Sequence, residues 1–573
     1  MDKQLPKAIT LSIALLQGII LWLLYYSFEQ QVFPATDPVW FNPLVSISAV
    51  IPVLFLVAAT PQNWQRLTKF LIGFSAILIM TSAFVGTQQK PIEIIESAGL
   101  VFILAITTGI ASFKAVMYGQ LWSEKSDFSY HKLFDLSWRN FLIGVESALF
   151  TGIFYGILGL GAALFHVIGI DVFSELLEKA WFNIPVICMA FGFAIITFRR
   201  ISKTVDIVAN ILQTLIKFLL PMLAVVALVF LITLPFTGLE KLWDTGRGST
   251  LLLIMQAVTL FFVNAVYQNR KQHPYPLFWH RFIYISVAVL PIYSMIIAYG
   301  LWLRIDQYGW SVGRCWGVVI WALLASFCLG YLQGIVRKKD DWLQSLGWIN
   351  VRMGIVILFV LLAVNTPILN FQKIAANSQI SRISANQSDI ENLDTYYFKW
   401  NLARPGYLAL QEFKSNLDDS QNELVAKINK LYLPKRKEGE QITQEQFVKH
   451  LHYWPAKDIF PAALSTSLYK QQTNRWFVLG QQEYYLLAID LNKDKQKEFL
   501  SVKEETEVIE VRIWRKNNEN EWISAVVDRI YQSGNSQDKV DIKSIITENN
   551  LGVTEPEWQD LMLGNVRMQI PNK

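Results

Sequence analysis

Charged residues are scarce in this chain. Asp, Glu, Lys and Arg make up 17% of its 573 residues, against roughly 25% in soluble proteins, while apolar residues reach 53%. The scarcity is confined to the first part of the chain. Up to about residue 370 there are 25 basic and 18 acidic residues, a net charge of +7. The shorter remainder has 26 basic and 28 acidic residues, a net charge of −2. The basic excess therefore belongs to the apolar part. It argues for a topological role of the charge and against a nucleic-acid partner.

Cysteine and the common catalytic motifs are also nearly absent. The three cysteines, Cys188, Cys315 and Cys328, lie in or at the ends of apolar stretches. No His-Glu-x-x-His, Walker or Gly-x-Ser-x-Gly pattern occurs, and His450, His452 and Asp458 lack a ligand spacing. We therefore expect no metal site and no cofactor, and catalysis is less favoured than binding.

What the chain does have is a series of apolar stretches, each approaching the ~20 residues that cross a bilayer. Eleven are found, at Ala8–Tyr26, Phe41–Thr60, Phe70–Val85, Ala98–Met117, Phe141–Leu164, Phe182–Phe198, Phe218–Leu234, Thr250–Val266, Phe282–Leu303, Cys315–Ile335 and Val351–Leu369. Nineteen Lys and Arg residues fall in alternate loops on one side, against six on the other. The positive-inside rule then predicts a cytoplasmic N-terminus and an exported C-terminus.

The rest of the chain has the composition of a soluble domain. Residues 370–394 are rich in Asn, Ser and Gln and predict a polar helical linker. Helical patterns follow at Arg404–Lys414, Ser420–Leu431 and Gln444–His452, and strand patterns at Tyr484–Leu491, Val508–Trp514 and Trp522–Val527. The predicted fold class is an α-helical polytopic membrane protein of about eleven transmembrane helices, residues 1–369, with an exported α+β domain at 395–573.

One loop carries a recognisable pattern. The run from Ala298 to Ser311, followed by Arg314, contains Arg304-x-x-x-Tyr308-Gly309-Trp310-Ser311-x-x-Arg314. It resembles the signature of a bacterial inner-membrane family labelled domain of unknown function 4153, in which Leu-Thr is commoner than Trp310-Ser311. Trp138-Arg139-Asn140 and the segment Tyr396–Leu410, with Arg404 and Gly406, are similar to two further family segments. The resemblance implies a membrane architecture up to about residue 415 and no particular activity.

The signature loop is the first candidate site: Arg304, Asp306, Tyr308, Gly309, Ser311 and Arg314. Its arginines lie on the side that is poor in cations. We expect Gly309 to allow a turn with positive φ, and Ser311 to be the N-cap of the tenth span. Arg314 then reaches either Asp306, tying the loop, or the phosphate of a lipid headgroup.

The second candidate is a polar stripe at spacings of three and four, so its members share one helix face: Lys203, Asp206, Asn210, Gln213 and Lys217. Arg199 extends the stripe by one turn, and Pro221 predicts a kink in the seventh span. The stripe is either the polar face of an interfacial helix with snorkelling lysines or the lining of a water-filled cavity.

The third candidate is Glu146 in the fifth span, which Arg139 on the same face could neutralise as a structural ion pair; a proton relay is the alternative.

The favoured function is a non-enzymatic scaffold or sensor of the bacterial envelope, with a periplasmic binding domain. Its partners are membrane lipids and an envelope protein, and no oligomeric state is predicted. The alternatives are a transporter or channel with a polar pathway near Asp206–Lys217, and a lipid- or glycan-modifying enzyme for which Asp306 is the candidate acid.

Overall fold

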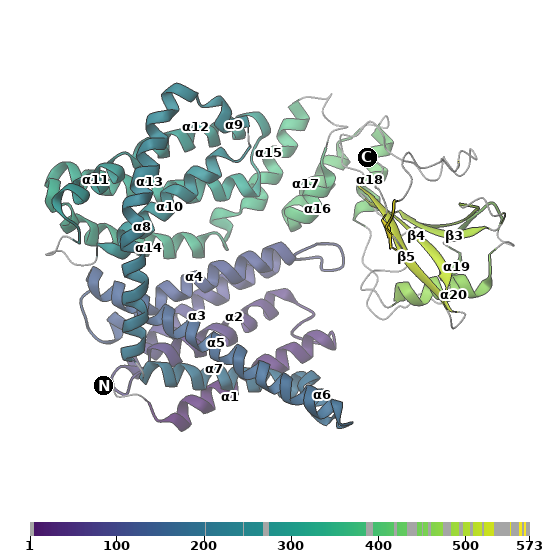
Figure 1. Ribbon diagram of the computed structural model, residues 1–573, viewed down its shortest axis with the longest axis horizontal. Coiled ribbons are helices and arrows are strands. Elements are labelled where there is room, and N and C mark those ends of the chain that lie inside the picture. The colour runs from purple at the N-terminus through teal and green to yellow at the C-terminus, as the bar shows by residue number, and fades with distance from the viewer. Residues whose placement is uncertain are drawn as a thin grey trace. The chain divides into compact units, whose positions relative to one another are not determined.

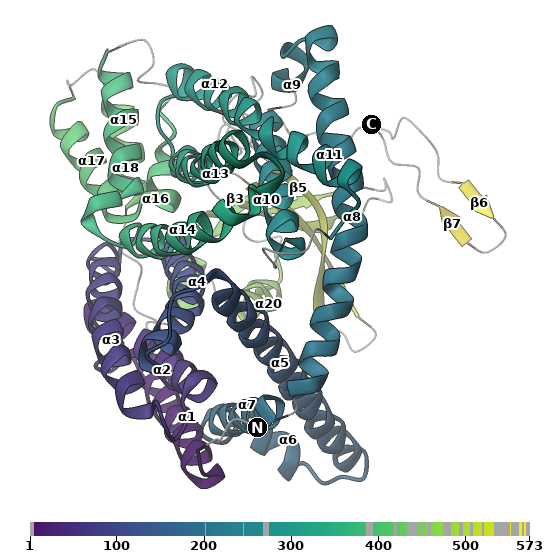
Figure 2. The same cartoon turned by 90° about the vertical axis from the view of Figure 1, so that its left-hand side faces the viewer.

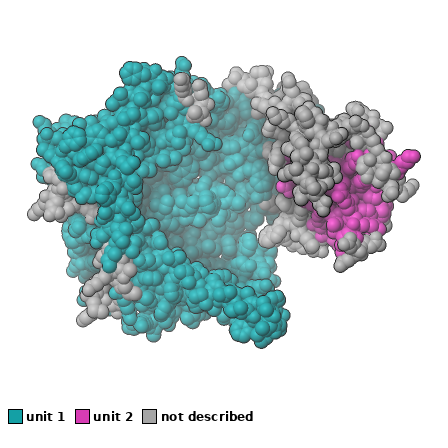
Figure 3. All heavy atoms as spheres, in the orientation of Figure 1, with its two compact units in different colours: residues 1–433 teal, residues 434–573 magenta. Residues whose placement is uncertain are grey.

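The structure is a computed structural model of the chain. It describes residues 5–200, 202–244, 246–267, 274–385, 393–417, 421–432, 444–449, 451–456, 460–473, 483–491, 495, 497–504, 508–517, 521–531, 551, 561–563 and 566–568. The chain divides into two compact units, Met1–Leu433 and Pro434–Lys573, coloured separately in Figure 3.

The first unit is helical and has two groups of helices followed by a smaller cap (Figures 1 and 2). The N-terminal helix group comprises α1 (Lys7–Glu29), α2 (Pro38–Ala58), α3 (Trp64–Thr87), α4 (Ala98–Ser123), α5 (Tyr130–Val167), α6 (Val172–Glu178) and α7 (Ala180–Arg200). The C-terminal helix group comprises α8 (Ser202–Thr237), α9 (Glu240–Asp244), α10 (Gly248–Val266), α11 (Leu277–Ala288), α12 (Leu290–Tyr308), α13 (Val312–Lys338) and α14 (Leu343–Ala363). The short 3-10 helices η1 (Lys339–Asp341) and η2 (Pro367–Leu369) flank α14.

Eleven segments of the described chain are long and apolar enough to cross a membrane, and each overlaps a predicted span. This protein is therefore a membrane protein with many apolar helices. The helices extend beyond the apolar stretches at several ends, most of all in α5, which begins at Tyr130 rather than Phe141. A helix continues into polar sequence as long as its backbone hydrogen bonds are maintained, so an apolar pattern alone underestimates its length.

The ninth span is divided into α11 and α12 around Val289. Pro291 has no amide hydrogen to donate, so the ladder is interrupted there. Gln256 of α10 occupies the gap: its Nε2 donates to the Leu290 carbonyl oxygen at 3.1 Å and contacts the Cys328 Sγ at 3.2 Å. A side chain from a neighbouring helix thus binds the main chain at the point where the ninth span is divided.

Helix α14 is shared by both helix groups. Its Leu343, Leu346 and Ile349 belong to the core of the C-terminal group. Its Val351, Leu358 and Leu362 pack against the core formed by α2, α3 and α4. Two polar contacts reinforce the second face: the Tyr118 hydroxyl donates to the Val351 carbonyl oxygen at 2.8 Å, and Asn365 Nδ2 donates to Thr107 Oγ1 at 2.7 Å. Figure 2 shows α14 between α4 and α13.

The cap is formed by α15 (Phe371–Ala385), α16 (Thr395–Asn401), α17 (Ala403–Ser415) and α18 (Asn422–Leu431). The predicted helical linker is therefore helical over residues 371–385. The cap has its own core around Phe398, Leu402 and Leu410, against which Ile94 and Val312 of the helix bundle also pack. Because α16–α18 lie in the first compact unit, the boundary between units falls after the predicted linker rather than within it.

The second unit contains a five-stranded sheet in the order β1-β2-β3-β4-β5, with β1 parallel to β2 and the other neighbours antiparallel. Its strands are β1 (Leu451–Trp454), β2 (Glu483–Ile489), β3 (Glu498–Glu504), β4 (Val508–Lys516) and β5 (Trp522–Tyr531). The helices are α19 (Gln444–Val448) and α20 (Ala462–Thr473), and β6 (Leu561–Leu563) pairs with β7 (Val566–Met568). The predicted helix over Gln444–His452 is wrong at its end, because His452 lies in β1.

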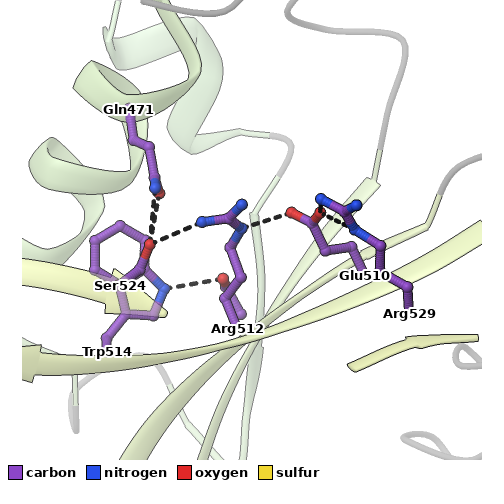
Figure 4. Close-up of polar contacts among 7 residues, drawn as sticks. Gln471, Glu510, Arg512, Trp514, Ser524 and Arg529 are labelled. Atoms are coloured by element: carbon purple, nitrogen blue, oxygen red, sulfur yellow. Dashed lines mark hydrogen bonds and ion pairs between the residues drawn. The ribbon is translucent and has the colours of Figure 1, made fainter. Parts of the chain in front are cut away.

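The sheet buries charge on the face that α20 contacts. Arg512 Nε donates to Glu510 Oε1 at 2.5 Å, and Arg529 binds the other carboxylate oxygen at 2.9 Å (Figure 4). Arg512 also donates to the Ser524 hydroxyl, which is hydrogen-bonded to Gln471 of α20. Alternate residues of a strand share a face, so Glu510, Arg512 and Trp514 follow one another along β4. The carboxylate is fully paired, as a buried charge requires.

Candidate functional site

The signature loop connects α12 to α13, and its backbone follows from two residues. Gly309 has a φ of 69°, in the left-handed region, and its amide closes α12 on the Ile305 carbonyl oxygen at 2.8 Å. Ser311 is the N-cap of α13: its hydroxyl accepts from the Arg314 amide at 3.3 Å. Both structural expectations for these residues are confirmed. The loop therefore ends one helix and starts the next within three residues.

Arginine side chains cover the C-terminal carbonyls of α12. Arg314 Nη1 donates to the Gly309 carbonyl oxygen at 2.7 Å and to that of Tyr308 at 3.2 Å. Arg382 of α15 donates to the carbonyl oxygens of Asp306 and Gln307 at 2.8 and 2.6 Å. The last carbonyls of a helix lack partners within it and carry a partial negative charge, so cations stabilise this end.

The expected tie between Arg314 and Asp306 is corrected by this geometry. In the described part of the chain Asp306 forms no ion pair; its side chain is exposed, and only its main-chain oxygen binds Arg382. The Arg314 and Arg304 guanidinium carbons lie 5.4 and 5.8 Å from the centre of the exposed Tyr308 ring. Arg304 also donates to the Trp243 carbonyl oxygen at the end of α9, at 3.1 Å.

The cap holds the loop through further hydrogen bonds. The Trp310 amide donates to the Ser378 hydroxyl at 2.9 Å, and the Val312 amide donates to the Tyr397 hydroxyl at 2.9 Å. Gln379 Nε2 donates to the carbonyl oxygens of Tyr308 and Trp310 at 3.0 and 2.8 Å. Burial raises the pKa of Tyr397, so its hydroxyl stays protonated at physiological pH. The signature loop is thus a docking point between the bundle and the cap.

Two more arginines bind helix C-termini in the same way. Arg404 of α17 donates from its amide and its guanidinium to the carbonyl oxygens of Gln88 and Thr87, both at 3.1 Å, at the end of α3. Arg199 is buried and donates to the carbonyl oxygens of Leu56 and Ala59 at 2.6 and 2.9 Å, at the end of α2. Arg199 therefore does not extend the polar stripe as predicted, since it lies on α7 and the stripe lies on α8.

The stripe on α8 is described only in part. The side chains of Lys203 and Asp206 lie outside the described residues. Asn210 and Lys217 are exposed and Gln213 is half-buried, and the Lys217 ammonium lies 5.7 Å from the centre of the Tyr275 ring. Tyr275 donates to the Lys217 carbonyl oxygen at 2.6 Å. Pro221 lies within the continuous helix α8.

Glu146 lies deeper in its helix than the apolar pattern predicted. Because α5 begins at Tyr130, Glu146 follows sixteen residues later, about 24 Å along the axis. The carboxylate Oε2 is buried and has no hydrogen-bond partner. Neutralisation of Glu146 by Arg139 stays a prediction.

A cavity of about 500 Å³ lies where the two helix groups meet. Its walls come from α4 and α5 on one side and from α10, α13 and α14 on the other: Phe113, Lys114, Met117, Tyr118, Tyr130, Leu133, Phe134, Ser137, Trp138, Phe141, Phe261, Asn264, Ala265, Phe327, Asn350, Val351, Gly354 and Ile357. Small-molecule sites of roughly 300–1,000 Å³ are typically found between helices of a bundle.

Lys114 is the charged residue of this lining. No hydrogen bond or ion pair of its ammonium is found within the described ranges. A cation within a spanning helix costs up to roughly 2.5–3.5 kcal/mol on insertion scales, the full value applying at the helix centre, so such residues normally serve a function or have a partner. From the apolar pattern, Lys114 is expected among the cytoplasmic-side cations at the end of the fourth span, whereas α4 continues to Ser123.

The polar side chains beside the cavity bind one another. The Asn264 Oδ1 accepts from the Tyr331 hydroxyl at 2.9 Å and from Asn350 Nδ2 at 2.5 Å. The Tyr130 hydroxyl donates to the Asn264 main-chain oxygen at 3.1 Å, and Asn264 Nδ2 donates to the Leu260 carbonyl oxygen at 2.9 Å. This network is internally satisfied, unlike Lys114 beside it.

Comparison with known proteins identifies the relationship of the chain. The family model described as "Domain of unknown function (DUF4153)" matches residues 19–413, more than half of the chain. The chain belongs to this family. No curated protein and no solved structure matches it. The DUF4153 match ends at the end of α17, so it includes the bundle and most of the cap and leaves out the sheet of the second unit.

The three DUF4153-like segments have different structural positions. The signature loop and Arg404 join the bundle to the cap, whereas Trp138 lines the cavity. Gly406 has a packing role, because a Cβ there would lie 2.5 Å from the Phe398 carbonyl oxygen. The cavity itself was missed from the sequence; a lysine inside the apolar stretch Ala98–Met117 was the available signal.

Proposed function

We propose that this protein is a non-enzymatic sensor or scaffold in the cytoplasmic membrane of a bacterium, with its cap and its C-terminal unit exported. The observation that carries the proposal is the attachment of the cap through Arg382 and Arg404 to the ends of α12 and α3. These arginines bind main-chain oxygens, which is a structural use of charge, and no described residue contributes a catalytic pair beside them.

The attachment makes the cap a rigid continuation of the bundle. The loop 307–312 binds α15 and α16 through three side chains, Ser378, Gln379 and Tyr397. A rigid cap suits a protein that supports a binding module, because a conformational change in the helix bundle is then transmitted to the exported part of the chain. The unequal distribution of Lys and Arg between alternate loops supports the export of both parts.

Cysteine labelling tests the orientation. In a variant lacking Cys188, Cys315 and Cys328, a cysteine replaces exposed Glu521 in the C-terminal unit or exposed Lys132 at the start of α5. We expect a membrane-impermeant maleimide to label position 521 in cells whose outer membrane alone is permeabilised, and position 132 only after lysis. The reverse pattern contradicts the proposal.

Photocrosslinking tests the binding role. Ile523, Val526 and Val527 of β5 are 53%, 43% and 57% exposed. With benzoylphenylalanine at each position in living cells, we expect a discrete adduct with one envelope protein. The adduct weakens in Arg382→Ala, which detaches the cap, and persists in Lys373→Ala, an exposed cation on the same helix. Absence of an adduct at all three positions excludes this stretch of β5 as the binding site.

A further inference from the structure

We propose that the cavity between the two helix groups binds an anionic amphiphile, with its acidic head on the Lys114 ammonium and its hydrocarbon chain against the aromatic wall. This inference goes beyond the proposed sensor or scaffold role and does not depend on it. The cavity belongs wholly to the first unit, and its occupant is tested without reference to the exported parts.

The charge of the occupant follows from Lys114. Within the described chain no carboxylate, carbonyl or hydroxyl accepts from its ammonium, although the side chain lines the cavity between the helix groups. The neighbouring Asn264 Oδ1 already accepts from the Tyr331 hydroxyl and from Asn350 Nδ2, at 2.9 and 2.5 Å. An anion brought in by the ligand supplies the missing acceptor and removes an uncompensated charge.

The apolar body of the occupant follows from the rest of the lining. Besides Tyr118 and Tyr130, six aromatic side chains contribute to the wall: Phe113, Phe134, Trp138, Phe141, Phe261 and Phe327. Tyr118 does not offer a free donor, because its hydroxyl binds the Val351 carbonyl oxygen. A hydrophilic anion would leave this surface in contact with water, whereas a hydrocarbon chain covers it.

The position of the cavity gives such a molecule access from the membrane. Tyr130 begins α5, Asn264 lies two residues before the end of α10, and Asn350 lies near the start of α14. Lys125, Lys338 and Lys339 lie near these helix ends, on the cation-rich side. The cavity is thus close to one headgroup region, where the acidic heads of lipids concentrate, and Lys114 lies about 14 Å inside the end of α4.

Photolabelling of the full-length protein tests the proposal. The purified protein in neutral detergent is labelled with a diazirine-bearing hexadecanoic acid, and the labelled peptides are mapped. We expect label on α4, α5 or α14, displaced by palmitate but not by hexadecanol, which has the same chain and no charge. Lys114→Met removes the ammonium and weakens labelling by about tenfold. Lys114→Arg retains it, and Lys69→Met, at an exposed lysine of α3, leaves labelling unchanged.

A second variant guards against misfolding. Ser137→Phe fills part of the cavity and keeps Lys114, and it also reduces labelling. Both variants are compared with the wild type by size-exclusion chromatography. If hexadecanol competes as well as palmitate, or if Lys114→Met and Ser137→Phe are folded and label normally, the proposal is wrong.

Competition from nanodiscs identifies the source of the anion. Displacement by phosphatidylglycerol nanodiscs, and not by phosphatidylcholine nanodiscs, indicates a membrane phospholipid. Displacement by palmitate alone indicates a free fatty acid. Neither result bears on the photocrosslinks from β5, so failure of the cavity proposal and failure of the sensor or scaffold proposal are distinguishable.

Discussion

The Arg382 side chain lies directly over Gly309. A Cβ added to Gly309 would come within 2.6 Å of the Arg382 Cδ, while the guanidinium of the same arginine binds the two carbonyls before the loop. The turn that ends α12 and the contact that holds the cap thus depend on the same residue lacking a side chain.

Gly309→Ala should therefore destabilise the bundle and its cap together. The left-handed φ of 69° alone costs roughly 1–2 kcal/mol for a residue with a Cβ, and displacement of Arg382 adds to it. We expect a lower melting temperature in detergent and faster proteolysis of the cap. The matched control is Gly313→Ala four residues later, where a Cβ meets no atom within 4 Å. An equal melting temperature for both variants would contradict this account.

Arg199→Met should destabilise the N-terminal helix group by about 2–3 kcal/mol, because it leaves the carbonyl oxygens of Leu56 and Ala59 buried without their donor. The measurement is the loss of the monodisperse peak after heating. Arg200→Met, at the exposed neighbour, should cost much less. Similar losses for the two variants would show that the contact with α2 adds little.

Gly354→Ala should loosen the junction of the two helix groups. A Cβ at Gly354 would overlap the Tyr118 hydroxyl oxygen, so Tyr118 must give up its bond to Val351. We expect faster hydrogen exchange in α14 and in the second half of α4. Gly144→Ala on α5, where a Cβ meets no atom within 4 Å, serves as control. Unchanged exchange in α14 would mean that Tyr118 adapts without cost.

The second unit should lose stability in acid through Glu510. Burial acts to raise the pKa of Glu510, but the hydrogen bonds and charges of Arg512 and Arg529 outweigh it and hold the pKa below its ordinary value. A lowered folded-state pKa contributes stability that is complete above the unfolded pKa of about 4.3 and is lost as the pH falls through the folded pKa.

Hydrogen exchange of β4 and β5 in the full chain measures this effect. We expect faster exchange as the pH is lowered below about 4, after correction for the intrinsic rate. Glu510→Gln should exchange faster at neutral pH and depend less on acid. Glu521→Gln, at an exposed carboxylate, should behave as the wild type. Identical pH profiles for wild type and Glu510→Gln would rule out this carboxylate as the cause.

The sequence predicted the spans well because the membrane imposes a minimum apolar length that does not depend on tertiary structure. It predicted the ends of α5 poorly because polar residues extend a helix at no cost outside the bilayer. Strand β3 was missed because Ser501 and Lys503 alternate with its apolar residues and give it a soluble appearance, although both are buried. Their burial depends on neighbouring strands, which a local pattern does not include.

In the candidate sites too, local features could be predicted from the sequence and long-range contacts could not. The positive φ of Gly309 and the cap by Ser311 are local effects and could be predicted. The partners of Arg314 could not, because Arg382 approaches from a helix almost seventy residues away and takes the neighbouring carbonyls. The Lys114 cavity needs five helices from both groups to form its walls, so no window of sequence contains it.

The shared helix α14 has a consequence for biosynthesis. Ribosomes deliver the helices in order, so α2, α3 and α4 enter the membrane long before residues 343–363 exist to cover them. Until then Thr107 and Tyr118 lack their partners Asn365 and Val351. During this time the N-terminal helices remain exposed to lipid or to an insertion factor. Chains that end before α14 should therefore be degraded by quality-control proteases.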